Sequence, residues 1–157
     1  MNKIITFSGN FIDLFQMNVN DISIIDISYG LSNIARFSGQ VPFCSVAKHS
    51  IYVANILPEE LRLSGLLHDA SEAYVGDIIS PIKPMMKEYL EIEELVMGII
   101  SKKWNLNVNH DLVRAADKQA LEYEKSTLFF NKSYRTEDQK QIIDQFMHLF
   151  DELTREK

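Results

Sequence analysis

The chain has 157 residues, of which 46% are hydrophobic and 24% charged, and its formal net charge is -6. This length and composition are typical of a single globular domain with a core of its own. The acidic balance argues against nucleic acid as a partner, because non-specific binding needs a basic surface. A small anionic substrate is still compatible with it, since a metal ion and a few local cations override the global charge.

The sequence also favours a cytoplasmic location. Cys44 is the one cysteine, so an intramolecular disulfide is excluded, which is usual in a reducing compartment. Residues 1–6 lack the apolar core of a signal peptide, and no apolar run approaches the roughly 18 residues that span a bilayer. We therefore expect no membrane partner.

The first twenty residues differ in pattern from the rest of the chain. Two short apolar runs, at residues 4–7 and 11–15, flank the turn sequence Ser8-Gly9-Asn10. This pattern predicts a short β-hairpin over residues 3–17.

The chain that follows has the apolar spacing of helices. Asp26 is the expected N-cap of a first helix that ends near residue 35, and Ser45 that of a second helix that ends near residue 57. Pro58 opens a third helix that runs to residue 74, because proline is tolerated in the first turn. Loops are expected between these helices, at residues 36–44 and 75–83.

Three longer helices complete the predicted fold. They are expected at residues 85–104, 111–130 and 137–152. The predicted fold class is all-α, a helical bundle with a small N-terminal β-hairpin, in one domain over residues 1–157. Within it we expect the hairpin at 1–20, the catalytic helical core at 26–130 and the C-terminal helix at 136–155.

His68 and Asp69 form the most informative pair in the chain. Adjacent residues on a helix differ by only about 100° in direction, so an imidazole and a carboxylate can both lean onto one metal ion. Glu72 lies one turn beyond His68 on the same predicted face. A ligand pair with a free carboxylate one turn later suggests metal-assisted hydrolysis, in which Glu72 handles the proton.

Two more candidate ligands lie on apolar helix faces. His49 shares a predicted buried stripe with Val46 and Val53, and Asp117 lies among core positions of its helix. An ionised carboxylate in a core costs several kcal/mol or more without a partner, and a metal ion is a good one. The resulting set can hold one divalent cation and leave positions open for water and substrate: His49, His68, Asp69 and Asp117. Mixed nitrogen and oxygen ligation favours Mn, Co, Ni, Fe or Zn over Ca or Mg.

Each of these residues also has a purely structural interpretation. A lone histidine on an apolar face is more often a core residue, and a His-Asp dipeptide is common by chance. His110 and His148 do not join the cluster and are interpreted as structural. Glu124 falls on the inward stripe of Asp117, yet with Glu122 it is interpreted as part of a solvated or salt-bridged face. The same interpretation is given to an acidic group of four residues: Glu88, Glu91, Glu93 and Glu94.

The order of a histidine, a His-Asp pair and a distant aspartate resembles the HD-domain phosphohydrolase superfamily. The likeness extends to Arg36-Phe37-Ser38-Gly39, to residues 45–50 and to residues 67–83, which resemble bacterial 5'-deoxynucleotidases and phage dATP triphosphohydrolases. The latter remove dATP where 2-aminoadenine replaces adenine in the genome, and the hairpin and residues 26–33 look more like them. The resemblance covers about residues 4–125.

The resemblance implies a role for each matching residue. His49, His68, Asp69 and Asp117 would bind the metal, and Glu72 would position or deprotonate the attacking water. Four further residues would bind substrate: Arg36 and Lys83 at phosphate, Asp77 at the sugar 3'-hydroxyl, and Phe37, where the nucleotidases often have tryptophan, at the base. As structural alternatives, Arg36 caps a helix, Asp77 is a turn residue after Gly76, and Phe37 belongs to the core.

The resemblance also implies a reaction. We expect a metal-dependent deoxynucleotide phosphohydrolase, in the first place a dATP-type triphosphohydrolase that releases deoxynucleoside and triphosphate. The alternatives are a 5'-deoxynucleotidase that converts dNMPs to deoxynucleoside and phosphate, and a nucleotide-binding module without turnover. One divalent transition metal (Co, Mn, Zn, Ni or Fe) is expected, with additional Mg for a triphosphate. A homo-oligomer, dimer or hexamer, is expected in the cytoplasm of a bacterial cell or a phage-infected host.

Overall fold

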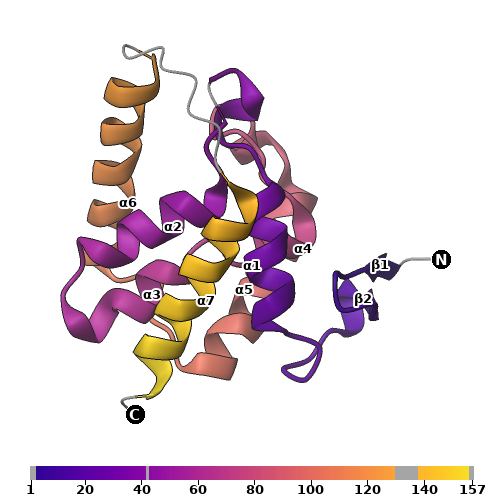
Figure 1. Cartoon of the computed structure of the whole chain (residues 1–157). Helices are drawn as coiled ribbons and strands as arrows, with labels where there is room; N and C mark the ends of the chain where they lie inside the picture. The colour runs from indigo at the N-terminus through magenta and orange to yellow at the C-terminus, as the bar shows by residue number, and fades with distance from the viewer. Residues whose placement is uncertain (1–2, 42, 130–137, 156–157) are drawn as a thin grey trace.

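The computed structural model describes residues 3–41, 43–129 and 138–155, and helices make up most of them (Figure 1). A two-stranded antiparallel hairpin precedes the helices. In Figure 1 this hairpin and helix α6 (Asp111–Glu124) lie at opposite sides of the bundle. The predicted class, an all-α bundle with a small N-terminal β-hairpin, is confirmed.

The hairpin forms at the predicted turn. Strand β1 (Lys3–Ile5) pairs with β2 (Phe11–Asp13), and Gly9 supplies the positive φ of 85° that the turn requires. The second strand is shorter than the predicted run. Asp13 accepts a hydrogen bond from the backbone N–H of Phe15 at 3.0 Å, and this bond starts a 3-10 turn.

The first helix corrects one prediction. Helix α1 (Ile24–Asn33) begins after Ser23, so Asp26 lies inside its first turn and is not the N-cap. The buried Asp26 carboxylate accepts hydrogen bonds from Ser8, at 2.7 Å from its backbone N–H and at 2.9 Å from its hydroxyl. Asp26 therefore ties the hairpin turn to the helix, a tertiary role that local sequence rules do not contain.

Ser45 caps helix α2 (Val46–Asn55) as predicted, because its hydroxyl accepts from the backbone N–H of Lys48 at 3.2 Å. The continuous helix predicted over 58–74 is wrong. A 3-10 turn (Glu59–Leu61) leads into α3 (Arg62–Leu66), and a separate short helix, α4 (Glu72–Val75), follows.

The break between α3 and α4 has a backbone cause. Hydrogen bonds spanning three residues, from the N–H of Ala70 to Leu67 and from that of Glu72 to Asp69, replace the four-residue bonds of a helix. His68 and Asp69 therefore lie in a turn between two helices and not on one continuous helix face.

The remaining helices agree with the sequence prediction in their described parts. They are α5 (Lys87–Trp104), α6 with a π-helical extension (Lys125–Phe129), and α7 (Gln139–Arg155). The expected ends at residues 130, 136 and 137 lie outside the described residues. His110 is the N-cap of α6, where its Nδ1 accepts from the Leu112 N–H at 3.2 Å, so its structural interpretation is confirmed. No helix in the described part of the chain has the length and apolarity that crossing a membrane requires.

The apolar core lies where α1, α2, α3, α5 and α7 meet. Its most deeply buried members are large aliphatic and aromatic side chains: Ile27, Leu31, Leu66, Leu67, Ile100 and Phe146. A second buried cluster joins α2 to α6 and contains Val53, Leu57, Leu61, Val113, Ala116 and Ala120. These two clusters fix α2, the turn after α3, and α6 relative to one another.

Gly30→Ala is expected to lower the free energy of unfolding by about 1–3 kcal/mol, the usual range for overpacking. A Cβ at Gly30 would lie 2.9 Å from Cβ and 3.0 Å from Cα of Ala73, where α1 meets α4. Urea unfolding followed by circular dichroism measures the change. Gly98→Ala on α5 is the matched control, since no atom lies within 4 Å of its added Cβ, and it should not lose stability. Equal urea midpoints for the Gly30 variant and the parent would mean that α1 and α4 pack less closely.

Candidate metal centre and substrate cleft

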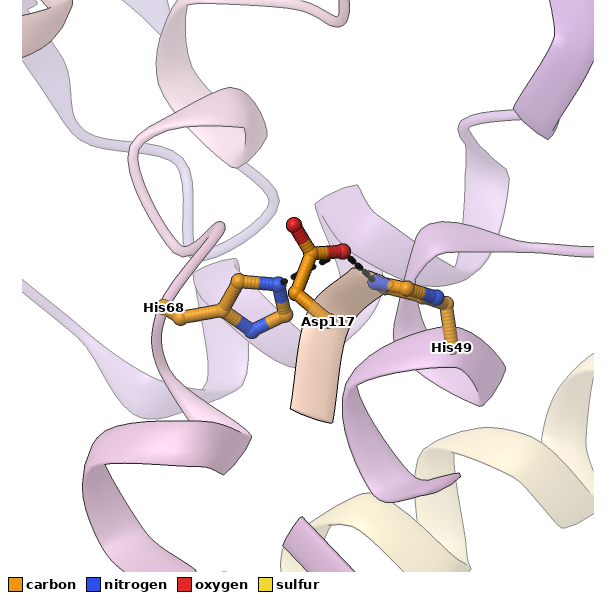
Figure 2. A group of neighbouring side chains, drawn as sticks. All are labelled: His49, His68 and Asp117. Atoms are coloured by element: carbon orange, nitrogen blue, oxygen red, sulfur yellow. Dashed lines mark hydrogen bonds and ion pairs between the residues drawn. The ribbon is translucent and has the colours of Figure 1, made fainter. Parts of the chain in front are cut away.

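Three predicted ligands from separate parts of the fold meet at one point. His49 comes from α2, His68 from the turn after α3, and Asp117 from α6 (Figure 2). One ligand atom from each residue lies within 4.8 Å of the other two. Oδ1 of Asp117 is 3.0 Å from Nε2 of His49 and 3.9 Å from Nε2 of His68. This set of imidazoles and a carboxylate around a common point can hold a divalent transition metal.

The orientation of His68 fits a metal ligand. Its Nδ1 donates to the backbone carbonyl of Gly65 at 2.8 Å, so in the neutral imidazole the lone pair of Nε2 is available to a metal ion. Nε2 is buried and makes no hydrogen bond to any described residue. An unpaired buried nitrogen costs free energy, and an ion bound at this point would remove that cost by giving the nitrogen a partner.

Asp69 faces the same point as the three ligands. Its Oδ2 lies 3.2 Å from Nε2 of His68 and 3.9 Å from Nε2 of His49. Burial alone would raise the pKa of Asp69, but the charge of His68, followed by those of His49 and Arg36, holds this pKa below its usual value. Burial would lower the pKa of His68, and the carboxylates of Asp69 and Asp117 outweigh it and raise that pKa to about 9.

The pKa of Asp117 is lowered in the same way as that of Asp69. Burial opposes its ionisation, but the hydrogen bond from His49 and the charge of His68 lower its pKa overall. Both carboxylates are therefore ionised at neutral pH, as metal ligands must be.

Glu72 is a buried carboxyl beside this cluster. Burial, followed by the charges of Asp69 and Asp77, raises the pKa of Glu72 to about 10, and Lys83 opposes the rise. Its Oε1 lies 3.8 Å from Nζ of Lys83, and its Oε2 has no hydrogen-bond partner among the described residues. Without a cation Glu72 holds its proton at neutral pH, and a positive ion bound nearby would lower its pKa. A strongly perturbed carboxyl in a cleft is a candidate functional group.

A cleft of about 670 Å³ opens next to the cluster, within the size range of small-molecule sites. Seven predicted site residues line it: Arg36, Phe37, Asp69, Glu72, Asp77, Lys83 and Asp117. His49 and His68 are not among the lining residues. The wall also carries apolar side chains from Ile78, Ile79, Pro81 and Leu121, and a further cation, Lys125, which sequence reasoning missed.

Glu93 and Tyr89 of α5 hold one side of the cleft. Oε1 of Glu93 lies 2.7 Å from Nζ of Lys83 and 3.1 Å from the Tyr89 hydroxyl. The Tyr89 hydroxyl also donates to the Gly76 carbonyl at 2.6 Å, directly before Asp77. Of the two interpretations given to Glu93, solvated or salt-bridged, the structure supports the salt-bridged one, and the residue positions a lysine predicted to bind phosphate.

Glu124 was interpreted from the sequence as solvated or salt-bridged, and the structure shows it salt-bridged and buried. It is 7% exposed, and its carboxylate accepts from Nε of Arg36 at 2.8 Å and lies 2.9 Å from Nδ1 of His49. The available signal was its spacing from Asp117, because seven residues are about two helical turns and put both on one face.

The segment that carries Arg36 and Phe37 is strained. Phe37 and Ser38 have φ of 55° and 51°, in the left-handed region that glycine favours, and Gly39 follows with φ of 70°. Each such residue other than glycine costs about 1–3 kcal/mol, and strain of this kind concentrates at functional sites. The ends of the segment are fixed by a bridge between Ala35 and Ser45 and by the bond from the N–H of Arg36 to Cys44 at 2.9 Å.

The chain is similar to three curated bacterial proteins, and no protein-family model matches it. It is 40% identical over 107 residues to the uncharacterized protein YfdR of Escherichia coli K12, which covers 68% of this chain and 60% of that protein. It is 36% identical over 110 residues to an uncharacterized protein of Rhodobacter capsulatus, covering 63% of this chain and 56% of that protein.

The third relative has a named activity. The chain is 34% identical over 91 residues to a 5'-deoxynucleotidase of Photobacterium profundum, covering 53% of this chain and 47% of that protein. The chain thus spans about half to three fifths of the length of the curated relatives it matches.

Proposed function

We propose that the chain is an HD-domain phosphohydrolase that uses a divalent transition metal to hydrolyse deoxynucleotides. The observation that carries the proposal is the meeting of His49, His68 and Asp117 beside a cleft that contains the buried carboxyl of Glu72. The partial similarity to a 5'-deoxynucleotidase supports the same class of reaction.

In this proposal His49, His68, Asp69 and Asp117 hold the ion, which is Co, Mn, Zn, Ni or Fe. A bound ion of this kind supplies polarisation of a phosphoryl oxygen and makes water a better nucleophile. Glu72 in its ionised form would accept the proton of the attacking water, and the charge of a bound ion nearby would favour that ionised form.

The cleft residues bind the rest of the substrate. Arg36 and Lys83 offset the charge of the phosphoryl group as it transfers, and the planar guanidinium of Arg36 can pair with two phosphate oxygens. Asp77 accepts a hydrogen bond from the sugar 3'-hydroxyl, and Phe37 stacks on the base. We propose dNMPs as the first substrate class, because the relative with a named activity is a 5'-deoxynucleotidase.

The triphosphohydrolase reaction on dATP or another dNTP becomes the second candidate. Lys125 favours it, since this third cation on the cleft wall can meet phosphates beyond the α-phosphate, with additional Mg on the triphosphate. A binding module without turnover explains neither the burial of Glu72 nor its place next to the ligand cluster.

Product analysis tests the substrate class. With Co²⁺ or Mn²⁺ and a panel of dNMPs, dNTPs and ribonucleotides, we expect orthophosphate and deoxynucleoside from the dNMPs, and little product from ribonucleotides. Chromatography separates nucleosides, nucleotides and inorganic products. Deoxynucleoside plus triphosphate from dNTPs would put the second candidate first. A protein that binds the metal and hydrolyses no member of the panel would contradict the proposed function.

We also propose that the protein is a homo-oligomer, dimer or hexamer. Large apolar side chains at the hairpin are exposed and provide a surface that association would bury: Ile5, Phe7, Phe11 and Phe15. Light scattering coupled to size exclusion measures the subunit number.

A further inference from the structure

Glu124 contacts two parts of the candidate site at once. One carboxylate oxygen lies 2.9 Å from Nδ1 of His49, and the other accepts from Nε of Arg36 at 2.8 Å. The His49 ring therefore lies between two carboxylates of α6, because Asp117 contacts its Nε2 at 3.0 Å. A single buried side chain joins a candidate metal ligand to a candidate phosphate-binding residue.

The contact with His49 determines which nitrogen can bind a metal. When a metal ion takes the Nε2 lone pair, the proton of His49 is on Nδ1, where the Glu124 carboxylate can accept it. His49 is 1% exposed, so water cannot easily take the place of Glu124. The Glu124 carboxylate thus holds the ring orientation and favours the tautomer that binds a metal through Nε2.

The contact with Arg36 anchors the strained segment that follows it. Phe37 and Ser38 adopt left-handed backbone conformations, and the anchors at the ends of the segment are backbone contacts. Glu124 adds a side-chain anchor from a different helix, 88 residues further along the chain. Loss of this contact would allow the segment to relax and to move Arg36 and Phe37 in the cleft.

We propose that Glu124 is a positioning residue that couples the metal ligand His49 to the substrate-binding Arg36. The roles of these two partners rest on the proposed function. The carboxylate holds the guanidinium and the imidazole at a fixed separation before substrate arrives, so that a phosphate bound by Arg36 meets the metal centre without rearrangement.

Two substitutions separate the two contacts. Glu124→Ala removes both of them. In Glu124→Gln the amide oxygen can still accept from Nδ1–H of His49, but the amide nitrogen cannot accept from Arg36. When a metal binds Nε2 of His49, the imidazole carries its proton on Nδ1. This N–H needs an acceptor, so the amide oxygen of the glutamine is the atom that turns toward His49. Glu122→Gln is the matched control, because Glu122 is an exposed carboxylate of the same helix and carries the same charge.

Metal affinity is the first readout. We expect Glu124→Ala to bind Mn²⁺ about 10–100-fold more weakly, the usual effect of removing the partner of a ligating histidine. Glu124→Gln should keep most of the affinity, and Glu122→Gln all of it. Calorimetric titration with Mn²⁺ alone gives these values without any substrate.

Substrate kinetics and hydrogen exchange test the Arg36 contact. Both Glu124 variants should show faster amide exchange at residues 36–41 in the absence of nucleotide, and Glu122→Gln should not. With dNMP as substrate, Glu124→Gln should raise KM more than it lowers kcat, because its metal ligand set is intact. A general loss of packing would instead speed exchange throughout α2 and α6.

The outcomes separate this proposal from the proposed function. Parental Mn²⁺ affinity in Glu124→Ala, or parental exchange at residues 36–41 in Glu124→Gln, would overturn the coupling. If Glu124→Ala does not fold, the coupling is tested with Glu124→Gln alone, through amide exchange at residues 36–41 and through KM. If the parent protein hydrolyses no nucleotide, the proposed function fails, while Mn²⁺ affinity and exchange still test the coupling.

Discussion

A Glu72→Gln variant is expected to keep its metal and its deoxynucleotide affinity and to lose about 10²–10⁴-fold in kcat, the usual contribution of a positioned acid or base. The amide has nearly the same shape as the carboxyl but cannot take up the proton of the attacking water. The buried position of Glu72 beside Asp69 and Asp77 leaves little room for solvent to act in its place. Steady-state kinetics with a dNMP, together with Mn²⁺ titration, measure both quantities.

Glu94→Gln is the control for this experiment, since Glu94 is exposed on α5 and outside the cleft lining. Its kcat should equal that of the parent. A Glu72→Gln variant with kcat within tenfold of the parent would exclude the proposed role of Glu72. Loss of metal from the same variant would instead make Glu72 a ligand.

Asp69→Ala is expected to purify with almost no bound metal. The substitution removes the carboxylate that lies 3.2 Å from Nε2 of His68, and it leaves the two imidazoles with Asp117 alone. Elemental analysis of protein loaded with Co²⁺ or Mn²⁺ and then desalted gives the metal content per chain. Circular dichroism shows whether the helices are retained.

His110→Ala is the control, because it removes a side chain of a metal-binding type that lies outside the candidate ligand set. His110 caps α6 and lies away from the cleft, so this variant should keep its metal and lose only a little stability. A full metal content in Asp69→Ala would remove Asp69 from the ligand set and leave His49, His68 and Asp117 as the candidates.

Much of the fold follows from local sequence rules. Helical spacing of apolar residues predicted the helices that pack on the core, and Ser45 and Gly9 marked a helix start and a turn. The break between α3 and α4 could not be predicted, because residues 67–71 contain no glycine or proline to signal it. The role of Asp26 depends on Ser8, which is 18 residues away, so it arises only from tertiary packing.

In the candidate site, too, local sequence patterns predicted some residues, while others depend on tertiary contacts. His49 and Asp117 were recognisable as polar residues among the apolar positions of their helices, and His68 through its pairing with Asp69. Glu124 was missed because its partners, His49 and Arg36, lie 75 and 88 residues away in sequence. Charge alone does not separate a buried bridging carboxylate from a solvated one, since the difference lies in which partners the fold brings to it.

The short helix α4 that carries Glu72 has a consequence for folding cooperativity. An isolated helix in water needs about 12–15 residues to be even marginally stable, and Glu72–Val75 is far below that length. Neighbours hold it in place: Ala73 packs against Gly30, and the Tyr74 hydroxyl accepts from the N–H of Ser23, the N-cap of α1, at 3.2 Å. The candidate catalytic carboxyl therefore belongs to the same cooperative unit as α1, which carries the core residues Ile27 and Leu31. Any change that loosens α1 is expected to displace Glu72 as well.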